Sequence, residues 1–165
     1  MAFDAFLKID GIDGESTDDK HQKWIEILSY SHGLSQPLSG SRSTSGGATA
    51  ERCDHSDFSV VKALDKASPK LALFCCNGKH IPTVKLELCR AGEKKEKYME
   101  YVMSDVIVSG VRKGGSAQGG ESLPLEEVTF NYGKIEWNYV EIDHKTGKPG
   151  GNVNAHWDVV ANKGG

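Results

Sequence analysis

Cysteine and histidine are the residue types here best suited to metal binding or nucleophilic catalysis. The four cysteines are Cys53, Cys75, Cys76 and Cys89. Cys75 and Cys76 are adjacent, which is not the C-x-x-C spacing of a zinc or redox site. Zinc binding by Cys53 or Cys89 together with a histidine is the alternative interpretation. The favoured interpretation is that the thiols are buried as small apolar groups, so we expect neither a metal nor a cofactor.

The histidines also lack a catalytic pattern. None belongs to an H-x-x-x-H pair or an H-E-x-x-H motif. A nucleophilic cysteine would need a base and an orienting group, which sequence does not place. No G-x-S-x-G elbow is present, and the segment KGGSAQGG lacks the GK[ST] ending of a phosphate-binding loop. We therefore expect no enzyme, and hydrogen-bonded structural or interface roles for His32 and His80.

Composition excludes several other classes. The 165 residues suit one domain over 1–165 with a formal net charge of −3. A pI near 6.1 argues against a nucleic-acid partner. No apolar run approaches the roughly 20 residues that span a bilayer, so no membrane insertion is expected. The N-terminus has no signal-peptide pattern, and we expect folding in the cytoplasm.

The most informative element that must position these residues lies within Gly14–Pro37. Its centre, Lys23–Gly33, carries large apolar groups on both parities. One set comprises Trp24, Leu28 and Tyr30, and the other comprises Ile25 and Ile27. In a strand, both faces would then be covered, one by the core and one by another subunit. A helix capped by Asp18 or Asp19 is the alternative, but the β-forming residues favour a long strand.

The remaining pattern predicts a mainly β protein. Further strands are expected over residues 2–9, 57–65, 81–90, 97–103, 106–111, 125–132, 135–140 and 155–160. The segment 57–65 also fits helical spacing. A short helix is predicted over Pro69–Asn77, with Ser68 as N-cap, Gly78 as its left-handed end, and Leu73 and Phe74 covering the sheet. The result is a compact antiparallel β-barrel or two-sheet barrel of about eight strands.

Two segments read as loops. The serine- and glycine-rich stretch 35–50 is an extended loop, either flexible or ordered by a partner. The acidic stretch 11–19 could bind calcium, but it lacks the EF-hand order of ligands, and a solvated turn is favoured.

Several segments, in the same order along the chain, resemble the haemolysin-coregulated protein (Hcp) family, the tube protein of bacterial type VI secretion systems. They are the MAFDAFLKIDGIDGEST opening, IEILSYSHG followed by SQP, DFSVVKALDKASPKL, CNGKHIP and VTFNYGKIEWNY. Together they span most of the chain, from Ala2 to about Trp157, and the resemblance also favours a strand over 57–65.

The resemblance implies a structural role without catalysis. Members of the family form hexameric rings that stack into the inner tube of a contractile injection machine. Sheath contraction drives the tube out, capped by a trimeric spike protein, and small effector proteins travel in the lumen. Family members are also released into the medium without a signal peptide. The expected partners are therefore copies of this chain, the spike, the sheath and effectors.

The resemblance also suggests site residues. We expect core and subunit contacts from Trp24, Ile25, Ile27, Leu28 and Tyr30. The loop Lys113–Gly120, with Ser116 at its middle, is a candidate for facing the channel, and an exposed turn without a role is an equal alternative. A competing function is a ligand-binding, for example sugar-binding, β-barrel module that uses Trp24, Trp137 and Trp157.

Overall fold

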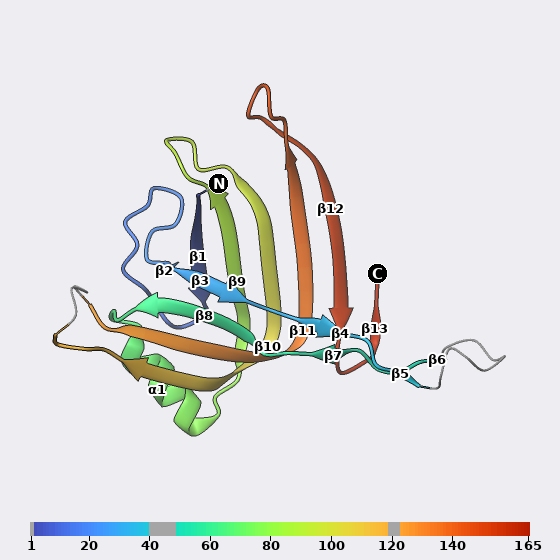
Figure 1. The fold of residues 1–165 in the computed structure, drawn as a ribbon, viewed down its shortest axis with the longest axis horizontal. Helices are drawn as coiled ribbons and strands as arrows, with labels where there is room; N and C mark the ends of the chain where they lie inside the picture. Colours follow the sequence, from blue (N-terminus) through green and yellow to red (C-terminus); the bar gives the residue numbers. More distant parts are fainter. Residues whose placement is uncertain (1, 40–48, 119–122) are drawn as a thin grey trace.

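The computed structural model describes residues 2–39, 49–118 and 123–165, which form antiparallel strands and one α-helix (Figure 1). The strands of three or more residues are β1 (Phe3–Ile9), β2 (Ile25–Ile27), β3 (Ser29–Ser31), β8 (Phe58–Ala63), β9 (Ile81–Arg90), β10 (Lys97–Gly114), β11 (Leu125–Ile142) and β12 (Pro149–Asp158). The predicted mainly β barrel with one short helix is confirmed, and so is the strand in the ambiguous segment 57–65.

The segment from Ile25 to Ser31 closes the barrel. Its first part, β2, pairs with β1, and its second part, β3, pairs with β8. The circuit runs on from β8 through β11, β10 and β9 back to β1. A bend at Leu28 separates the two parts, and its backbone N–H donates to the Val61 carbonyl over 2.8 Å. The single long strand predicted over Lys23–Gly33 is thus wrong in detail, because the chain changes partner strand at this bend.

A long hairpin, β10–β11, forms part of both walls of the structure. Figure 1 shows both strands bending from the upright sheet into the lower, crosswise one. At the bend Asp105 has a φ of 51°. A Cβ at Gly133 would lie 3.2 Å from the Asp105 carboxylate, so a side chain there would crowd the bend. The separate strands predicted over 97–103 and 106–111, and over 125–132 and 135–140, are therefore two continuous bent strands.

Beyond the barrel, the sheet continues as a flange, which we define as residues 134–142 of β11 together with β12. β8 pairs with the first part of β11, and β12 pairs with the part that follows. The short strand β13 (Lys163–Gly164) pairs with β12 only at Trp157 and Asp158. His156 also exchanges two backbone hydrogen bonds with Gly165. Among the described residues, the outer edge of β12 from Pro149 to Ala155 therefore has no strand beside it.

Helix α1 (Ser68–Asn77) packs beneath the crosswise sheet. Gly78 ends it in the left-handed conformation with a φ of 62°, as predicted. The N-cap is Ala67 instead of the predicted Ser68, whose hydroxyl is used elsewhere in the core. Phe74 is buried as expected, whereas Leu73 is 55% exposed and points away from the sheet.

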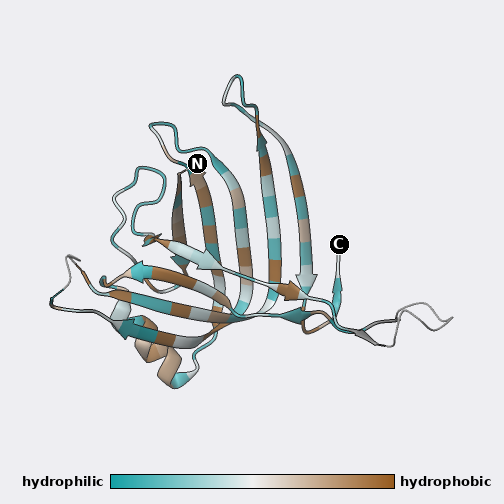
Figure 2. Cartoon of the chain, viewed as in Figure 1, coloured by the Kyte–Doolittle hydropathy of each residue, from teal (hydrophilic) through white to brown (hydrophobic). Residues whose placement is uncertain are grey.

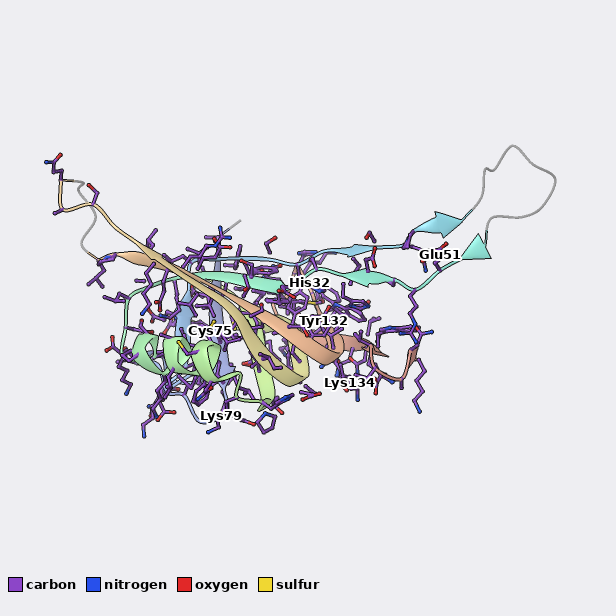
Figure 3. All side chains as sticks on the ribbon, turned by 90° about the horizontal axis from the view of Figure 1, so that it is seen from below. His32, Glu51, Cys75, Lys79, Tyr132 and Lys134 are labelled. Carbon is purple, nitrogen blue, oxygen red and sulfur yellow. The ribbon has the colours of Figure 1, made fainter. Side chains whose placement is uncertain are left out.

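The predicted loop 35–50 belongs to a projecting ribbon, here called the arm. It consists of the paired strands β4 (Leu34–Ser35) with β7 (Asp54–His55), and β5 (Leu38–Ser39) with β6 (Thr49–Ala50). Residues 40–48 lie outside the described part of the chain. Figure 3 shows the arm running away from the barrel. The described ends of the predicted loop are thus paired strands, and its centre lies outside the described residues.

The core fills the barrel and the space above α1. Its fully buried members include Leu7, Ile25, Phe58, Leu86 and Phe130. They alternate with polar residues along the strands, as the banding in Figure 2 shows. The helix in the described part of the chain is neither long nor apolar enough to cross a bilayer.

Candidate functional site

The flange carries an apolar face that begins as barrel core and continues into solvent. Ile135, Trp137 and Tyr139 lie on the same face of β11 because side chains alternate along a strand. Ile135 is fully buried, whereas Tyr139 is 46% exposed and its cross-strand partner Val153 is 60% exposed. Exposed apolar surface continuous with a core is typical of a protein–protein contact. This face is therefore the first candidate assembly surface.

A pocket of about 360 Å³ lies between the arm and the flange. Trp137 and Trp157 line it from the flange, and Leu34, which is 48% exposed, lines it from the arm. The three tryptophans of the sugar-binding alternative are thus not all together. Trp24 lies elsewhere, against the ring of His21 at a centroid distance of 4.8 Å.

The same pocket contains the side chains closest to a metal-ligand set. Glu51, Cys53, His55 and His156 all line it. Among the residues described by the structure, however, no three His, Cys, Asp or Glu side chains converge closely enough to hold a metal ion. The zinc alternative through Cys53 therefore has no support from the geometry.

At the base of the arm, one phenol contacts two histidines. The hydroxyl of Tyr132, on β11, lies 2.7 Å from Nε2 of His32 and 2.7 Å from Nδ1 of His55. Figure 3 shows His32 and Tyr132 together where the arm leaves the barrel. The structural role expected for His32 is thus a contact that ties the arm to β11. His80 makes a surface contact instead, with Nδ1 2.8 Å from Asp105.

The crosswise sheet presents a second candidate surface, here called the hydroxyl face. Its members come from four neighbouring strands or their flanks, carry short polar side chains, and point away from the core: Ser29, Ser31, Ser59, Ser109 and Thr129. The Ser109 hydroxyl lies 2.9 Å from that of Thr129 and donates to Asp57 over 2.8 Å. Glu127 lies on the same side of β11 as Thr129 and accepts a hydrogen bond from Ser59 over 3.2 Å. The hydroxyl face is therefore polar, with short hydroxyl side chains beside a carboxylate.

A polar recess of about 640 Å³ lies on the opposite face of the flange. Asn138, Asn152 and Asn154 line it, beside Glu100 and Lys97. Glu100 accepts hydrogen bonds from Lys97 over 2.8 Å and from Asn138 over 3.1 Å. Its charge is therefore already compensated, and the recess offers mainly neutral amide groups to a partner.

Cys89, His21 and Asp18 resemble a nucleophile, base and orienting acid in order, but cannot act as one. Cys89 Sγ lies 3.9 Å from Nε2 of His21, and Nδ1 of His21 lies 2.6 Å from Asp18. Glu87 also contacts Nε2, at 3.0 Å. Cys89 is fully buried, and burial together with the nearby Glu87 raises its pKa to about 11. A thiol that stays protonated and sealed from solvent is not a nucleophile.

The other three cysteines are less buried than predicted. Cys53 and Cys75 are partly buried, and Cys76 is exposed on α1. Only Cys89 fits the expectation of a thiol that fills the core. The sequence of α1 did not reveal the exposure of Cys76, because residues 71–74, just before Cys75 and Cys76, are apolar at every position and do not distinguish the buried face of the helix from the exposed one.

The stretch chosen as a core and contact element divides between these roles. Ile25 and Ile27 are buried in the barrel, and Tyr30 is partly buried 6.0 Å from the ring of Phe58. Trp24 is partly buried, and Leu28 is 59% exposed at the bend. Leu28 is therefore the member of this set that is available to a neighbouring molecule.

Ser116 lies at the exposed end of the β10–β11 hairpin. Its hydroxyl accepts a hydrogen bond from the backbone N–H of Gln118 over 3.3 Å. It lines a shallow pocket with Leu123 and Pro124. The remainder of the loop Lys113–Gly120, residues 119 and 120, lies outside the described residues.

Tyr139, Val153 and Tyr132 were not among the site residues predicted from the sequence. The alternation of Ile135, Trp137 and Tyr139 places them on one face of a strand. It does not indicate at which residue the other elements of the fold stop covering that face. Likewise the contact of Tyr132 with two histidines joins residues far apart in sequence, so no local spacing could have indicated it.

Comparison with known proteins identifies a family that this chain matches. The family described as "Type VI secretion system effector, Hcp" matches residues 6–139. Protein hcp1 of Pseudomonas aeruginosa is 38% identical over 163 residues, which cover 98% of each chain.

Solved structures agree with the sequence relatives. One described as "Structure of a type six secretion system protein" has a TM-score of 0.93 and 37% identity, covering 99% of this chain and 100% of its own. Hcp1 from Salmonella typhimurium has a TM-score of 0.81 and 35% identity, covering 99% of both chains. The chain therefore belongs to the Hcp family of type VI secretion system proteins.

Proposed function

We propose that this chain is the structural tube subunit of a type VI secretion system. Six copies form a ring, rings stack into the inner tube, and sheath contraction expels the tube with small effector proteins in its lumen. Its partners are further copies of itself, the trimeric spike protein, the contractile sheath and the effectors. In this role the protein acts by shape, without catalysing a reaction, and leaves the cell through the secretion machine itself.

The observation that carries this proposal is the uncovered apolar face of the flange. Tyr139 and Val153 are exposed although they continue a buried core, and the outer edge of β12 from Pro149 to Ala155 is unpaired within the described chain. An open edge beside apolar surface is a liability unless another molecule covers it. The arm and the bend at Leu28 are different surfaces, so a head-to-tail contact between unlike surfaces can close into a ring.

The test is the mass and shape of the purified protein. Light scattering coupled to size exclusion is expected to give about six times the 17.9 kDa chain mass. Negative-stain images are expected to show annular particles. A monomer at high concentration, without such particles, would contradict the proposal.

A matched pair of variants tests which surface makes the ring. Tyr139→Glu places a charge on the apolar face of the flange and should shift the population towards monomers. Leu73→Glu alters a similarly exposed apolar residue, 55% exposed, on the far side of the crosswise sheet. It should leave ring formation unchanged. Equal behaviour of the two variants would argue against the flange as the subunit contact.

For the lumen we propose two surfaces, the hydroxyl face and the loop that carries Ser116. Both present short polar side chains to solvent, which lets different effector proteins approach closely. Asn131 lies on the hydroxyl side of β11, is exposed, and donates to Asp57 over 3.1 Å. It therefore offers a position for a bulky substitution that does not disturb the core.

Cargo co-purification separates the two surfaces. Asn131→Trp or Ser116→Trp should reduce the amount of small secreted protein that co-purifies with the ring, while ring formation persists. Leu73→Trp on α1 is the control and should keep the cargo. A surface whose variant keeps normal cargo levels is excluded from the lumen.

The second candidate function is a sugar-binding module, favoured by the pairing of Trp137 and Trp157 in one pocket. Stacking on aromatic rings is a common way to hold sugars. A glycan array and titration with simple sugars test it. Binding that disappears in Trp157→Ala, with a monomeric parent protein, would support this function over the tube.

A further inference from the structure

The arm leaves and rejoins the barrel at two histidines. His32 precedes β4, His55 ends β7, and the described strands of the arm lie between them. Both imidazoles contact the hydroxyl of Tyr132, each at 2.7 Å. We propose that His32, His55 and Tyr132 form an acid-sensitive clasp that fixes the direction of the arm when both histidines are neutral and releases it when they are protonated.

The clasp depends on how one hydroxyl can serve two rings. A phenol donates one hydrogen bond and accepts others. Nε2 of His55 is buried and has no hydrogen-bond partner among the described residues. Hydrogen on Nδ1 of His55 therefore satisfies the contacts best. His55 then donates to the Tyr132 oxygen, and Tyr132 donates to Nε2 of His32.

Protonation disrupts this series of hydrogen bonds at both histidines. A proton on Nε2 of His32 removes the acceptor of the Tyr132 hydrogen. A proton on Nε2 of His55 creates a buried N–H without an acceptor, which is costly. Two positive rings would also repel each other across one oxygen atom.

The surroundings do not offset these effects. Burial lowers the pKa of His32, and His55 lowers it further. Burial also lowers the pKa of His55, although Asp54 partly opposes this. Burial raises the pKa of Tyr132, as do Cys53 and Asp57, so the phenol stays protonated. The other titratable groups that line the pocket with His55 are Glu51 and His156.

The sign of the pH effect follows from these directions. Released histidines bind protons with an ordinary pKa of about 6.5, and clasped ones bind them only at lower pH. The clasped state is therefore fully favoured above about pH 6.5 and loses its advantage as pH falls below that value. Other hydrogen bonds at the arm base do not titrate here. They are the donation from Ser56 N–H to Gly33 O over 3.0 Å and from Gly33 N–H to the Ser56 hydroxyl over 2.8 Å.

The consequence for assembly rests on the proposed function. If the arm contacts a neighbouring subunit, acid weakens that contact without unfolding the barrel. Rings that are intact at neutral pH would then loosen in an acidic compartment or culture medium.

Hydrogen exchange of single amides at about pH 7.5 and about pH 5 tests the clasp in the full chain. Protection factors of the Gly33 and Ser56 amides should fall at least about tenfold on acidification, once corrected for intrinsic rates. Amides in the β1–β9 ladder, such as Leu86, are the internal control and should not change. Constant protection of Gly33 and Ser56 would overturn the proposal.

Two variants sharpen the result. The double variant His32→Gln with His55→Asn keeps hydrogen-bonding groups near the same positions but does not titrate, so its arm protection should be independent of pH. Tyr132→Phe should lower arm protection already at neutral pH. The same acid response in the double variant as in the parent would overturn the clasp.

Ring mass measured on the same samples distinguishes the clasp from the proposed function. Absence of rings at every pH would contradict the tube, whereas the exchange result on the arm decides the clasp by itself. Rings that dissociate in acid only when the histidines are present would support both.

Discussion

Lys62 on β8 and Glu126 on β11 face each other as a directly opposed cross-strand pair, and both side chains are completely buried. Lys62 Nζ also contacts Asp65 at 2.9 Å and donates to the Ser68 hydroxyl over 3.2 Å. Ser68 in turn donates to Glu126 over 2.6 Å. The start of α1 is thereby fixed to the crosswise sheet by charged groups, which explains why Ser68 does not cap its own helix.

Lys62→Met should destabilise the protein strongly. The substitution fits the volume of the lysine stem but leaves Glu126 as a buried charge without its cation. Breaking a buried pair in this way typically costs about 3–5 kcal/mol. Urea denaturation followed by far-UV circular dichroism measures the loss in the free energy of unfolding.

The double variant Lys62→Met with Glu126→Leu is the control for that measurement. With both charges removed, the cost should largely disappear, because an apolar replacement of a buried ion pair is often neutral or stabilising. A double variant as unstable as Lys62→Met would show that the pair has a role beyond mutual compensation.

Asp18 should contribute stability that acid removes. Burial tends to raise the pKa of Asp18, but hydrogen bonds from His21 and Lys95 outweigh it and hold that pKa below its usual range. A carboxylate with a lowered pKa stabilises the fold above its unfolded pKa of about 3.9, and this contribution is lost as pH falls below that value.

Asp18→Asn therefore should be less stable than the parent at about pH 7, and the two should converge at about pH 2. Urea midpoints over this range provide the measurement. A difference that stays constant down to the lowest pH would mean that the carboxylate charge is not what stabilises this loop.

Thiol reactivity should follow burial. Iodoacetamide at about pH 8 should modify Cys76 quickly, because it is exposed and thiolate is the reactive form. Cys89 should react only after denaturation, since it is fully buried and its pKa is raised to about 11. Peptide mass spectrometry resolves the two sites. Rapid labelling of Cys89 in the folded protein would reopen the catalytic interpretation of its contact with His21.

Gly14→Ala should destabilise the fold. A Cβ at Gly14 would lie 2.7 Å from Cα of Ile25, which is backbone and cannot move aside. Overpacking of this kind typically costs about 1–3 kcal/mol. Gly114→Ala is the matched control, because a Cβ there meets no atom within 4 Å. Equal thermal midpoints for both variants would show that the loop at Gly14 can shift without loss.

The sequence predicted the fold class because strand periodicity is local. The alternation in Ile81–Arg90 and the left-handed end of the helix at Gly78 depend only on neighbours along the chain. The bend at Leu28 could not be predicted, since it arises from a change of partner strand between β1 and β8. The same holds for Asp105, whose positive φ bends one continuous strand where two separate strands were predicted.

The candidate surfaces were less predictable than the fold. Strand parity placed Ile25 and Ile27 in the core, but it gave the same expectation for Leu28, which is exposed. The helical pattern likewise placed Leu73 against the sheet, whereas it is exposed. Exposure of Tyr139 depends on where covering elements stop, which is a property of the whole structure. In the clasp, Tyr132 lies 100 positions after His32 and 77 positions after His55, so no local sequence pattern could indicate it.

Strands β10 and β11, each 18 residues long, run from the barrel wall towards the flange, and β11 forms part of it. A mechanical load on the flange therefore reaches the barrel through the covalent backbone of β11 and the rungs of one shared ladder. Within β11, the strand is continuous over Leu125–Ile142, so no linker separates the flange from the barrel wall there. A subunit built in this way transmits an applied force with little internal deformation, so neighbours bound at the flange move together with the barrel.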